Sequence, residues 1–226
     1  MRIMRHKQRI LRLLRGDDLG ALLAELEQLS PEQVLNPLFS GICRADEHIR
    51  WQAITAMGAT VARLADADME AARVVMRRFM WSLNDESGGI GWGAAESMAE
   101  SMAIHAGLAR EYGHMQVAYM REDGNYQELA AMQQGVIWGV GRLTLARPGL
   151  MNKHRAAFYL PPYLQSKDGA VRGLAAWALG LLRARQAGPA INKLVGDHWE
   201  VRLFVDRQLK KTTVDELARG ALALLS

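Results

Sequence analysis

The feature that most constrains the fold of this chain is an internal repeat with a period near 40 residues. Four ten-residue segments align without gaps: IRWQAITAMG from Ile49, IGWGAAESMA from Ile90, MQQGVIWGVG from Met132 and VRGLAAWALG from Val171. A fifth segment, VRLFVDRQLK from Val201, keeps only the opening. In the first four, the first, fifth and ninth positions are apolar, and the eighth and tenth are small. A helical period places the first, fifth, eighth and ninth positions on one face. Each segment therefore predicts the inner helix of a helix pair in a stacked array.

The residues before each inner helix predict the outer helix of the same pair. These outer helices are expected over residues 31–43, 68–82, 108–121, 150–165 and 187–195. Pro31 suits the first position of a helix. An aspartate recurs in the turns, where its carboxylate can accept amide protons from the start of a helix: Asp46, Asp85, Asp168 and Asp197. The sequence thus predicts an all-α superhelix of about five helix pairs, forming a single domain over residues 1–226.

The two ends of the chain depart from the repeat and predict caps. Residues 1–29 form a basic N-terminal cap, residues 30–198 the repeats and residues 199–226 a C-terminal cap. Val201, Leu203 and Val205 alternate with other residues, which predicts a short β-hairpin over residues 200–213 rather than a helix. Thr213 and Glu216 then have the spacing of a capping box, which predicts a last helix over about 214–225.

Composition and charge narrow the class of protein. Half of the 226 residues are apolar, and no stretch is long and apolar enough to span a membrane. The chain has one cysteine, Cys43, which cannot form an internal disulfide, so we expect a reducing, cytoplasmic compartment. Its apolar helical context favours a role in packing. The net charge is +4, but residues 1–15 alone carry +6, which leaves the rest at −2. The high pI is therefore weak evidence for nucleic-acid binding.

The repeat resembles the HEAT-like family, including the variety found in phycobilin lyases. The resemblance rests on an aspartate in the turn, then Val-Arg or Ile-Arg, then Ala-x-x-Ala-Leu-Gly or a close variant. The matching residues are Asp168, Val171, Arg172, Ala175, Ala178, Leu179 and Gly180, and Asp46, Ile49, Arg50, Ala53, Ala56, Met57 and Gly58. The second and third repeats lack the arginine. The resemblance covers about residues 30–205 and implies a fold, but it says little about function.

Four of the six tryptophans fall on equivalent positions of the aligned inner helices. Trp51 and Trp92 occupy the third position, and Trp138 and Trp177 occupy the seventh, one turn further along the same face. In HEAT-like solenoids the inner helices line a concave groove, so this stripe would face a bound partner. The alternative is that the indoles fill space between adjacent inner helices, opposite small residues. Arg142 is the basic side chain that the alignment places on the groove side.

A glycine-rich turn precedes the second inner helix and contributes further candidates. Gly88, Gly89 and Gly91 follow Asp85, and glycine permits close approach of a ligand to the backbone, although close packing explains the same pattern. Trp92, Glu96 and Glu100 are spaced by four residues and share one helix face. An indole with two carboxylates could hold a cationic group of a partner.

These observations favour a non-enzymatic binding module that holds a protein or peptide segment. The sequence contains no metal-ligand spacing, nucleophile elbow or phosphate-binding loop, so we expect no catalytic residue, metal or cofactor. One alternative is a HEAT-like alkylpurine DNA glycosylase, suggested by chain length and by the four-residue spacing of Trp81 with Asp85 and of Trp92 with Glu96. The acidic groove candidates disfavour it, because phosphates require Lys and Arg. A bilin-lyase-like activity is a third reading, suggested by the repeat type alone.

Overall fold

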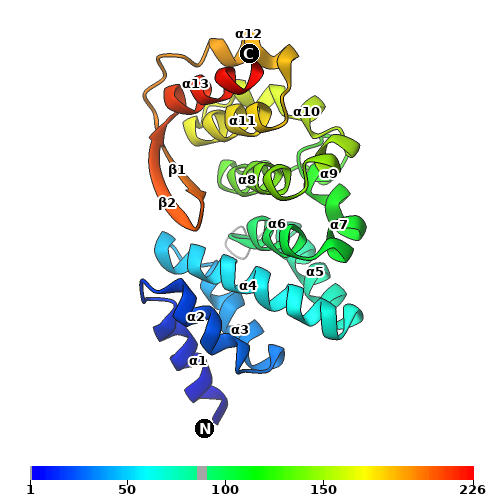
Figure 1. Cartoon of the computed structure of the whole chain (residues 1–226), viewed down its shortest axis with the longest axis vertical. Helices are drawn as coiled ribbons and strands as arrows, with labels where there is room; N and C mark the ends of the chain where they lie inside the picture. The colour runs from blue at the N-terminus through cyan, green and yellow to red at the C-terminus, as the bar shows by residue number, and fades with distance from the viewer. Residues whose placement is uncertain (1, 86–90) are drawn as a thin grey trace. The chain divides into compact units, whose positions relative to one another are not determined.

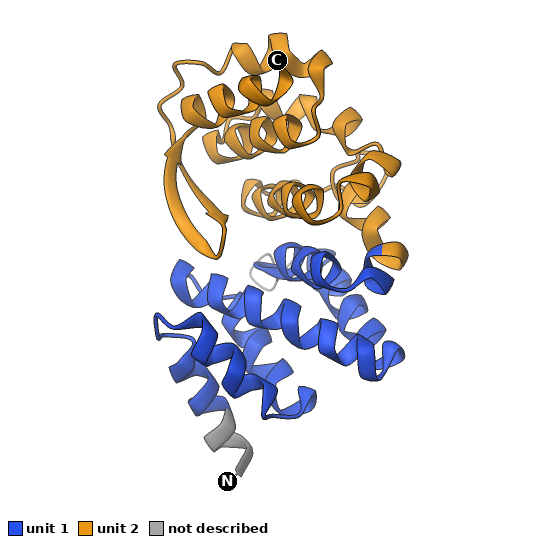
Figure 2. Cartoon of the chain, viewed as in Figure 1, with its two compact units in different colours: residues 1–109 blue, residues 110–226 orange. Residues whose placement is uncertain are grey.

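The computed structural model describes residues 2–85 and 91–226 of the chain. It forms two compact units, residues 1–109 and residues 110–226, coloured separately in Figure 2. Stacked helices dominate both units, which confirms the predicted all-α repeat fold. The expectation of a single domain over the whole chain stays a prediction.

The first unit is built around the long inner helix α4 (Glu47–Ala67), which packs against the helices before and after it (Figure 1). Leu38, Ile54, Met57 and Phe79 are fully buried between these helices and form the core of the unit. The other helices are α1 (Arg2–Leu13), α2 (Leu19–Glu27), α3 (Pro31–Ile42), α5 (Met69–Leu83), α6 (Ala94–Ile104) and the start of α7 (Ala106–Ala118).

The basic first helix packs against α3 through its apolar side. Ile10 and Leu14 are fully buried. On the solvent side, Arg9 forms an ion pair with Glu25 of α2. The helix thus covers the end of the first unit's core while its described arginines remain partly or largely exposed.

Aspartates begin several of the helices by accepting an amide proton from the first turn. Asp46 accepts from Ile49 at the start of α4, at 3.2 Å, and Asp168 accepts from Val171 at 2.9 Å. These two turn aspartates behave as predicted. Asp197 instead accepts two hydrogen bonds from the Arg172 guanidinium, at 2.6 and 3.0 Å. Helix α6 begins at Ala94 with Gly93 at its N-cap position, so Asp85 does not cap this helix.

The second unit repeats the arrangement of inner and outer helices. Its inner helices are α8 (Ala130–Ala146), α11 (Gly169–Leu181) and α13 (Val214–Leu225), and neighbours in this order pack together (Figure 1). The remaining elements are α7, α9 (Pro148–Lys153), α10 (Ala156–Tyr159), η1 (Pro161–Gln165), η2 (Arg185–Ala187), α12 (Gly188–Asn192), β1 (Glu200–Val205) and β2 (Gln208–Thr213).

Glycine at the tenth position of the repeat lets successive inner helices approach closely. A Cβ added to Gly58 of α4 would lie 2.5 Å from Cγ of Glu100 on α6. One added to Gly180 of α11 would lie 2.6 Å from the Ala221 backbone on α13. Such distances are shorter than van der Waals contact, so any side chain here would force the helices apart. The small tenth position is therefore a packing requirement.

The predicted hairpin is confirmed. Strands β1 and β2 pair antiparallel with Glu200 opposite Thr213 and Val205 opposite Gln208. Val201 and Leu203 are buried, at 0% and 6% exposure, as the alternation predicts. The two-residue loop places Asp206 and Arg207 at φ of 53° and 60°, the backbone of a tight turn that matches the twist of the strands.

The fifth aligned segment, from Val201, forms strand β1 and not an inner helix, in agreement with the hairpin prediction. The inner helix of the last pair is α13, which begins at Val214 and packs extensively on α11. Its sequence VDELARGALA has apolar first, fifth and ninth positions and small eighth and tenth positions. Val214 follows Val171 by 43 residues, which restores the repeat period. The hairpin is thus an insertion before the fifth inner helix. The predicted capping box of Thr213 with Glu216 is confirmed at the start of this helix.

Proline and backbone geometry divide the outer helix predicted over residues 150–165. It consists of α9, α10 and η1, separated at Arg155, which has a φ of 57°, and at the Pro161–Pro162 pair. The predicted outer helices at 31–43 and 68–82 agree with α3 and α5 within one residue. Among the described residues, every helix is too short or too polar to cross a lipid bilayer.

Candidate functional site

The structure places the predicted site residues of the first unit around α4 and α6. Trp51 is 8% exposed on α4, and Trp92 is 36% exposed just before α6. Gly91 is buried in the turn that leads to α6, and Asp85 is partly buried after α5. Gly88 and Gly89 lie outside the described residues. Gly93 adopts a φ of 72° at the start of α6, with its backbone against Ile42, so glycine is required there for both conformation and space.

The two carboxylates predicted to form a recognition edge have different surroundings. Glu100 is only 8% exposed, and its aliphatic stem packs over Gly58. Glu96 is partly exposed, but burial of its carboxyl raises its pKa, against the smaller lowering effects of its backbone amide and of the charge on Arg50. Much of the Glu100 surface is therefore occupied by helix packing. Their role as a recognition edge stays a prediction.

In the second unit, the predicted tryptophans touch other parts of the same chain. Trp138 is 3% exposed, and its indole nitrogen donates a hydrogen bond to the backbone carbonyl of Phe204 in β1, at 2.7 Å. Trp177 is partly buried with its ring against Gly141 of α8. Arg142 is partly buried on α8. The idea that all four tryptophans lie along one side of the inner helices spans both units and stays a prediction.

Cys43 has the environment of a packing thiol. It is partly buried, and its sulfur lies 3.8 Å from the carbonyl oxygen of Trp92. Burial raises the pKa of the thiol, although the charge of Arg78 opposes this effect. Because the thiolate is the reactive form, a raised pKa disfavours nucleophilic chemistry at this residue.

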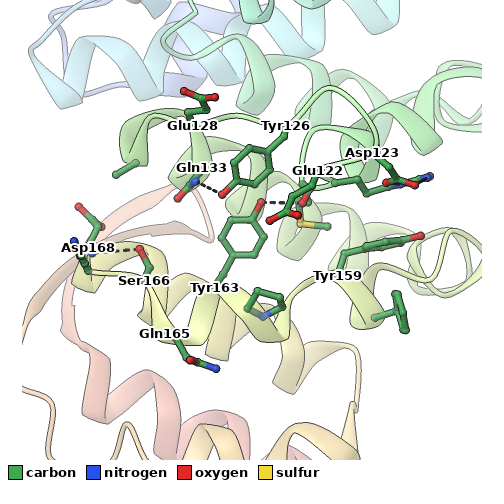
Figure 3. A pocket seen from close by; sticks show the side chains of 16 residues that line it. Glu122, Asp123, Tyr126, Glu128, Gln133, Tyr159, Tyr163, Gln165, Ser166 and Asp168 are labelled. Carbon is green, nitrogen blue, oxygen red and sulfur yellow. Dashed lines mark hydrogen bonds and ion pairs between the residues drawn. The ribbon is translucent and has the colours of Figure 1, made fainter.

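A cavity of the second unit lies between two turns that the sequence patterns did not single out. It has a volume of about 850 Å³ and is open to solvent (Figure 3). One wall is the α7–α8 turn together with the start of α8, and the other is the stretch from α10 to the start of α11. We call it the tyrosine pocket, after three of its lining residues: Tyr126, Tyr159 and Tyr163.

Hydrogen bonds hold two of these tyrosines in place. The Tyr163 hydroxyl donates to the carbonyl of Met120 at 3.0 Å and ties η1 to the end of α7. The amide nitrogen of Gln133 donates to the Tyr126 hydroxyl, at 3.1 Å, and to the carbonyl of Gln127, at 2.9 Å. Burial raises the pKa of Tyr163, and the nearby Tyr126 and Glu122 raise it further, so its hydroxyl stays protonated as a donor. The pocket walls are therefore preorganised.

The charged side chains of the tyrosine pocket fall into two groups. Arg121 and Asp123 form a two-pronged ion pair at 2.7 and 2.9 Å, and Asp168 is engaged in capping α11 and in accepting from Gln134. Glu122, Glu128 and Lys167 are exposed, and their side chains contact no oppositely charged group in the described part of the chain. The pocket thus offers two uncommitted carboxylates and one uncommitted ammonium group.

The tyrosine pocket is lined by aromatic, carboxylate, amide and hydroxyl side chains. No cluster of three or more His, Cys, Asp and Glu with metal-binding geometry occurs within residues 2–85 and 91–226. The lining contains no cysteine or histidine. Its aromatic rings and carboxylates are suited to binding a side chain or a small group from solvent.

Comparison with solved structures supports the fold. A designed armadillo repeat protein superposes with a TM-score of 0.52 at 18% identity, covering 96% of this chain and 99% of the other. A second, in complex with the peptide (KR)4, gives 0.52 at 16% identity, covering 96% and 98%. A computationally designed armadillo repeat protein for modular peptide recognition gives 0.50 at 17% identity, covering 96% and 99%. No protein-family model and no curated protein matches the chain.

Proposed function

We propose that this protein is a non-enzymatic binding module that holds a segment of a partner protein, with the tyrosine pocket receiving one of its side chains. The observation that carries the proposal is the pocket itself. It is open, about 850 Å³ in volume and walled by aromatic rings that hydrogen bonds hold in position. Preorganised aromatic pockets lower the entropic cost of binding and are typical anchor sites in protein recognition.

The similar solved structures support the same class of function. One of the designed armadillo repeat proteins is in complex with the peptide (KR)4, and another was designed for modular peptide recognition. At 16–17% identity these proteins share only the fold with this chain. These structures therefore support a helical-repeat scaffold that presents a binding surface. The proposed position of the partner on that surface rests on the tyrosine pocket.

One feature of the second unit favours an anionic partner as a second candidate. Residues 110–226 contain 16 basic and 10 acidic side chains, a net charge of +6. A charge of that size attracts nucleic acid at low salt. The tyrosine pocket has the opposite balance, with four acidic and two basic side chains among its lining residues. The local chemistry therefore favours a protein segment at this site.

A pair of adjacent alanines tests the proposal. Ala130 lines the pocket at the start of α8, whereas Ala131 is exposed and is not among the lining residues. Peptides would first be selected for binding to the wild-type protein from a random 12-residue display library. Fluorescence anisotropy would then measure their affinity for the wild type, for Ala130→Trp and for Ala131→Trp. We expect Ala130→Trp to weaken binding by about tenfold or more, the loss of one anchor residue, and Ala131→Trp to leave it within about twofold.

Three outcomes would decide against the proposal. A selection that returns no binding peptide would remove the evidence for peptide recognition. Peptides that bind Ala130→Trp as tightly as the wild-type protein would place the site elsewhere. A labelled duplex DNA that binds more tightly than every selected peptide at 0.15 M salt would favour the nucleic-acid candidate. Far-ultraviolet circular dichroism of both variants shows whether the helices are retained.

A further inference from the structure

We infer that the tyrosine pocket selects a guanidinium group, the side chain of an arginine in the bound segment. This inference rests on the proposed function and names the chemistry of the group that the pocket receives. Three features of the pocket favour a guanidinium: its balance of charge, its uncommitted carboxylates and its aromatic rings, two of which already contact arginines.

The charge of the pocket contrasts with that of its surroundings. Its lining carries a net charge of −2 within a unit of net charge +6. A cation would therefore experience no general attraction to this unit, and favourable interaction would be confined to the pocket. Such a local reversal of charge gives specificity for one group at one position rather than for polybasic segments in general.

The two uncommitted carboxylates line the same pocket as an accessible aromatic ring. Glu122 and Glu128 lie on either side of Tyr126 in the view of Figure 3. Tyr126 is 39% exposed, so part of its ring is available to a ligand. A planar guanidinium can stack on an aromatic face while its N–H groups reach toward neighbouring carboxylates, which a compact ammonium cannot do equally well. The arrangement therefore favours arginine over lysine.

Two other rings of the pocket already hold guanidinium groups of this chain. The Arg121 guanidinium carbon lies 5.2 Å from the centre of the Tyr159 ring, and that of Arg155 lies 4.9 Å from the centre of the Phe158 ring. Both distances are within the range of cation–π attraction. Aromatic rings of the pocket thus contact a guanidinium group at two positions within the chain, and Tyr126 offers a further ring for such a contact.

Single-residue probes separate the guanidinium from the rest of a peptide. We would titrate the ¹⁵N-labelled full chain with the N-acetyl methylamides of arginine, lysine, norleucine and glutamate, following the amides of Ala130 and Tyr126 by NMR. We expect saturable shifts at these amides with arginine and weaker binding of lysine. Norleucine, which has a similar stem without charge, should bind weakest of the three or not at all, and glutamate should not bind.

Variants of the pocket give the expected changes for arginine. Glu122→Gln and Glu128→Gln should each weaken binding by about threefold, in the range of exposed ion pairs. Glu27→Gln, an exposed carboxylate on α2, is the matched control and should change nothing. Tyr126→Leu should weaken binding about two- to fivefold through loss of the ring face, whereas Tyr126→Phe keeps the ring and should keep binding. Raising NaCl from 0.05 to 0.5 M should weaken arginine but not norleucine.

The outcomes distinguish this inference from the proposed function. If norleucine binds at Ala130 and Tyr126 as tightly as arginine, selectivity for a guanidinium is wrong while the pocket remains a side-chain site. If lysine matches arginine and Tyr126→Leu has no effect, the site recognises charge alone and the stacking argument fails. If no probe shifts these amides, the inference is overturned, and the peptide selection with Ala130→Trp decides the proposed function separately.

Discussion

The indole ring of Trp177 lies against the bare backbone of Gly141, so that a methyl group added to this glycine would overlap the six-membered ring. Gly141 is the tenth residue of the third aligned segment, and Trp177 is the seventh residue of the fourth. The contact shows that one member of the tryptophan series fills space opposite a small residue.

Gly141→Ala should therefore destabilise the protein although alanine is the better helix former. We expect the free energy of unfolding to fall by about 1–3 kcal/mol, the usual cost of overpacking. Gly220→Ala in α13 is the control, because no atom lies within 4 Å of the position of its added Cβ. It should be neutral or stabilise the chain by up to about 1 kcal/mol. Urea denaturation measures both, and equal stability of the two variants would contradict the packing argument.

Trp138→Phe should loosen the hairpin. The change removes the indole donor of the 2.7 Å bond to the Phe204 carbonyl, and we expect a loss of about 1–2 kcal/mol. Hydrogen exchange should accelerate first at the amides of β1 and β2. Trp199→Phe is the comparison, since Trp199 is 54% exposed and its indole nitrogen has no hydrogen bond within the described residues. Unchanged exchange in the hairpin would show that the bond contributes nothing to its stability.

Glu96→Gln should raise stability at neutral pH. Burial raises the pKa of Glu96, so the folded state holds its proton more tightly than the unfolded chain does. A buried acid of this kind makes the folded protein less stable as the pH rises from the pKa of the acid in the unfolded chain, about 4.3, through its pKa in the folded protein. Thermal unfolding between pH 4 and 8 should show that the unfolding temperature of the variant exceeds that of the wild type by an amount that grows with pH. A difference that narrows as the pH rises would reverse this interpretation.

Asp197→Asn should have the opposite dependence on pH. Burial alone raises the pKa of Asp197, but hydrogen bonds from Arg172 and from the Trp199 amide outweigh it, so the pKa is lowered. The stabilisation is therefore present above the pKa of aspartate in the unfolded chain, about 3.9. It is lost as the pH falls through the pKa of Asp197 in the folded protein. We expect Asp197→Asn to cost about 1–3 kcal/mol at pH 7 and much less near pH 2. A cost that does not change with pH would exclude a role for the charge.

The protein should release no base from alkylated duplex DNA. The reason is that the two carboxylates spaced four residues after a tryptophan, Asp85 and Glu96, lie in a stretch, residues 16–109, with 6 basic and 14 acidic side chains. Phosphate binding needs the opposite balance. Chromatography of the reaction supernatant detects free base directly. Release above background that disappears in Asp85→Asn would establish the glycosylase alternative.

The periodicity of apolar residues predicted the helices well because it follows the buried face of each helix, and the packing of these faces determines how the helices stack. It placed α3 and α5 within one residue and identified the alternation of β1. It also aligned Val201 with the other inner helices, because Val-Arg occurs near the start of both β1 and α11. The better match, from Val214, follows the hairpin and became visible only when that insertion was set aside.

The tyrosine pocket escaped sequence reasoning for a different reason. Its walls are two turns about 40 residues apart, and a comparison of helix positions does not test whether turns meet. The polar run from Arg121 to Tyr126 and the aromatic pair Phe158–Tyr159 beside prolines were the available signals. Likewise, the alignment assigned Trp138 to a helix face but did not indicate that Phe204 of the same chain would contact it.

The connections that lead into the inner helices differ widely in length. They are residues 43–46 before α4 and 166–168 before α11, but residues 119–129 before α8 and 193–213 before α13. Doubling the length of a loop costs only about 0.6 kcal/mol of closure entropy, whereas we expect one methyl group at Gly141 to cost about 1–3 kcal/mol. Insertions are thus cheaper than substitutions in the stack. A lineage with this architecture can therefore acquire a new ligand by lengthening a connection while its helices remain almost unchanged.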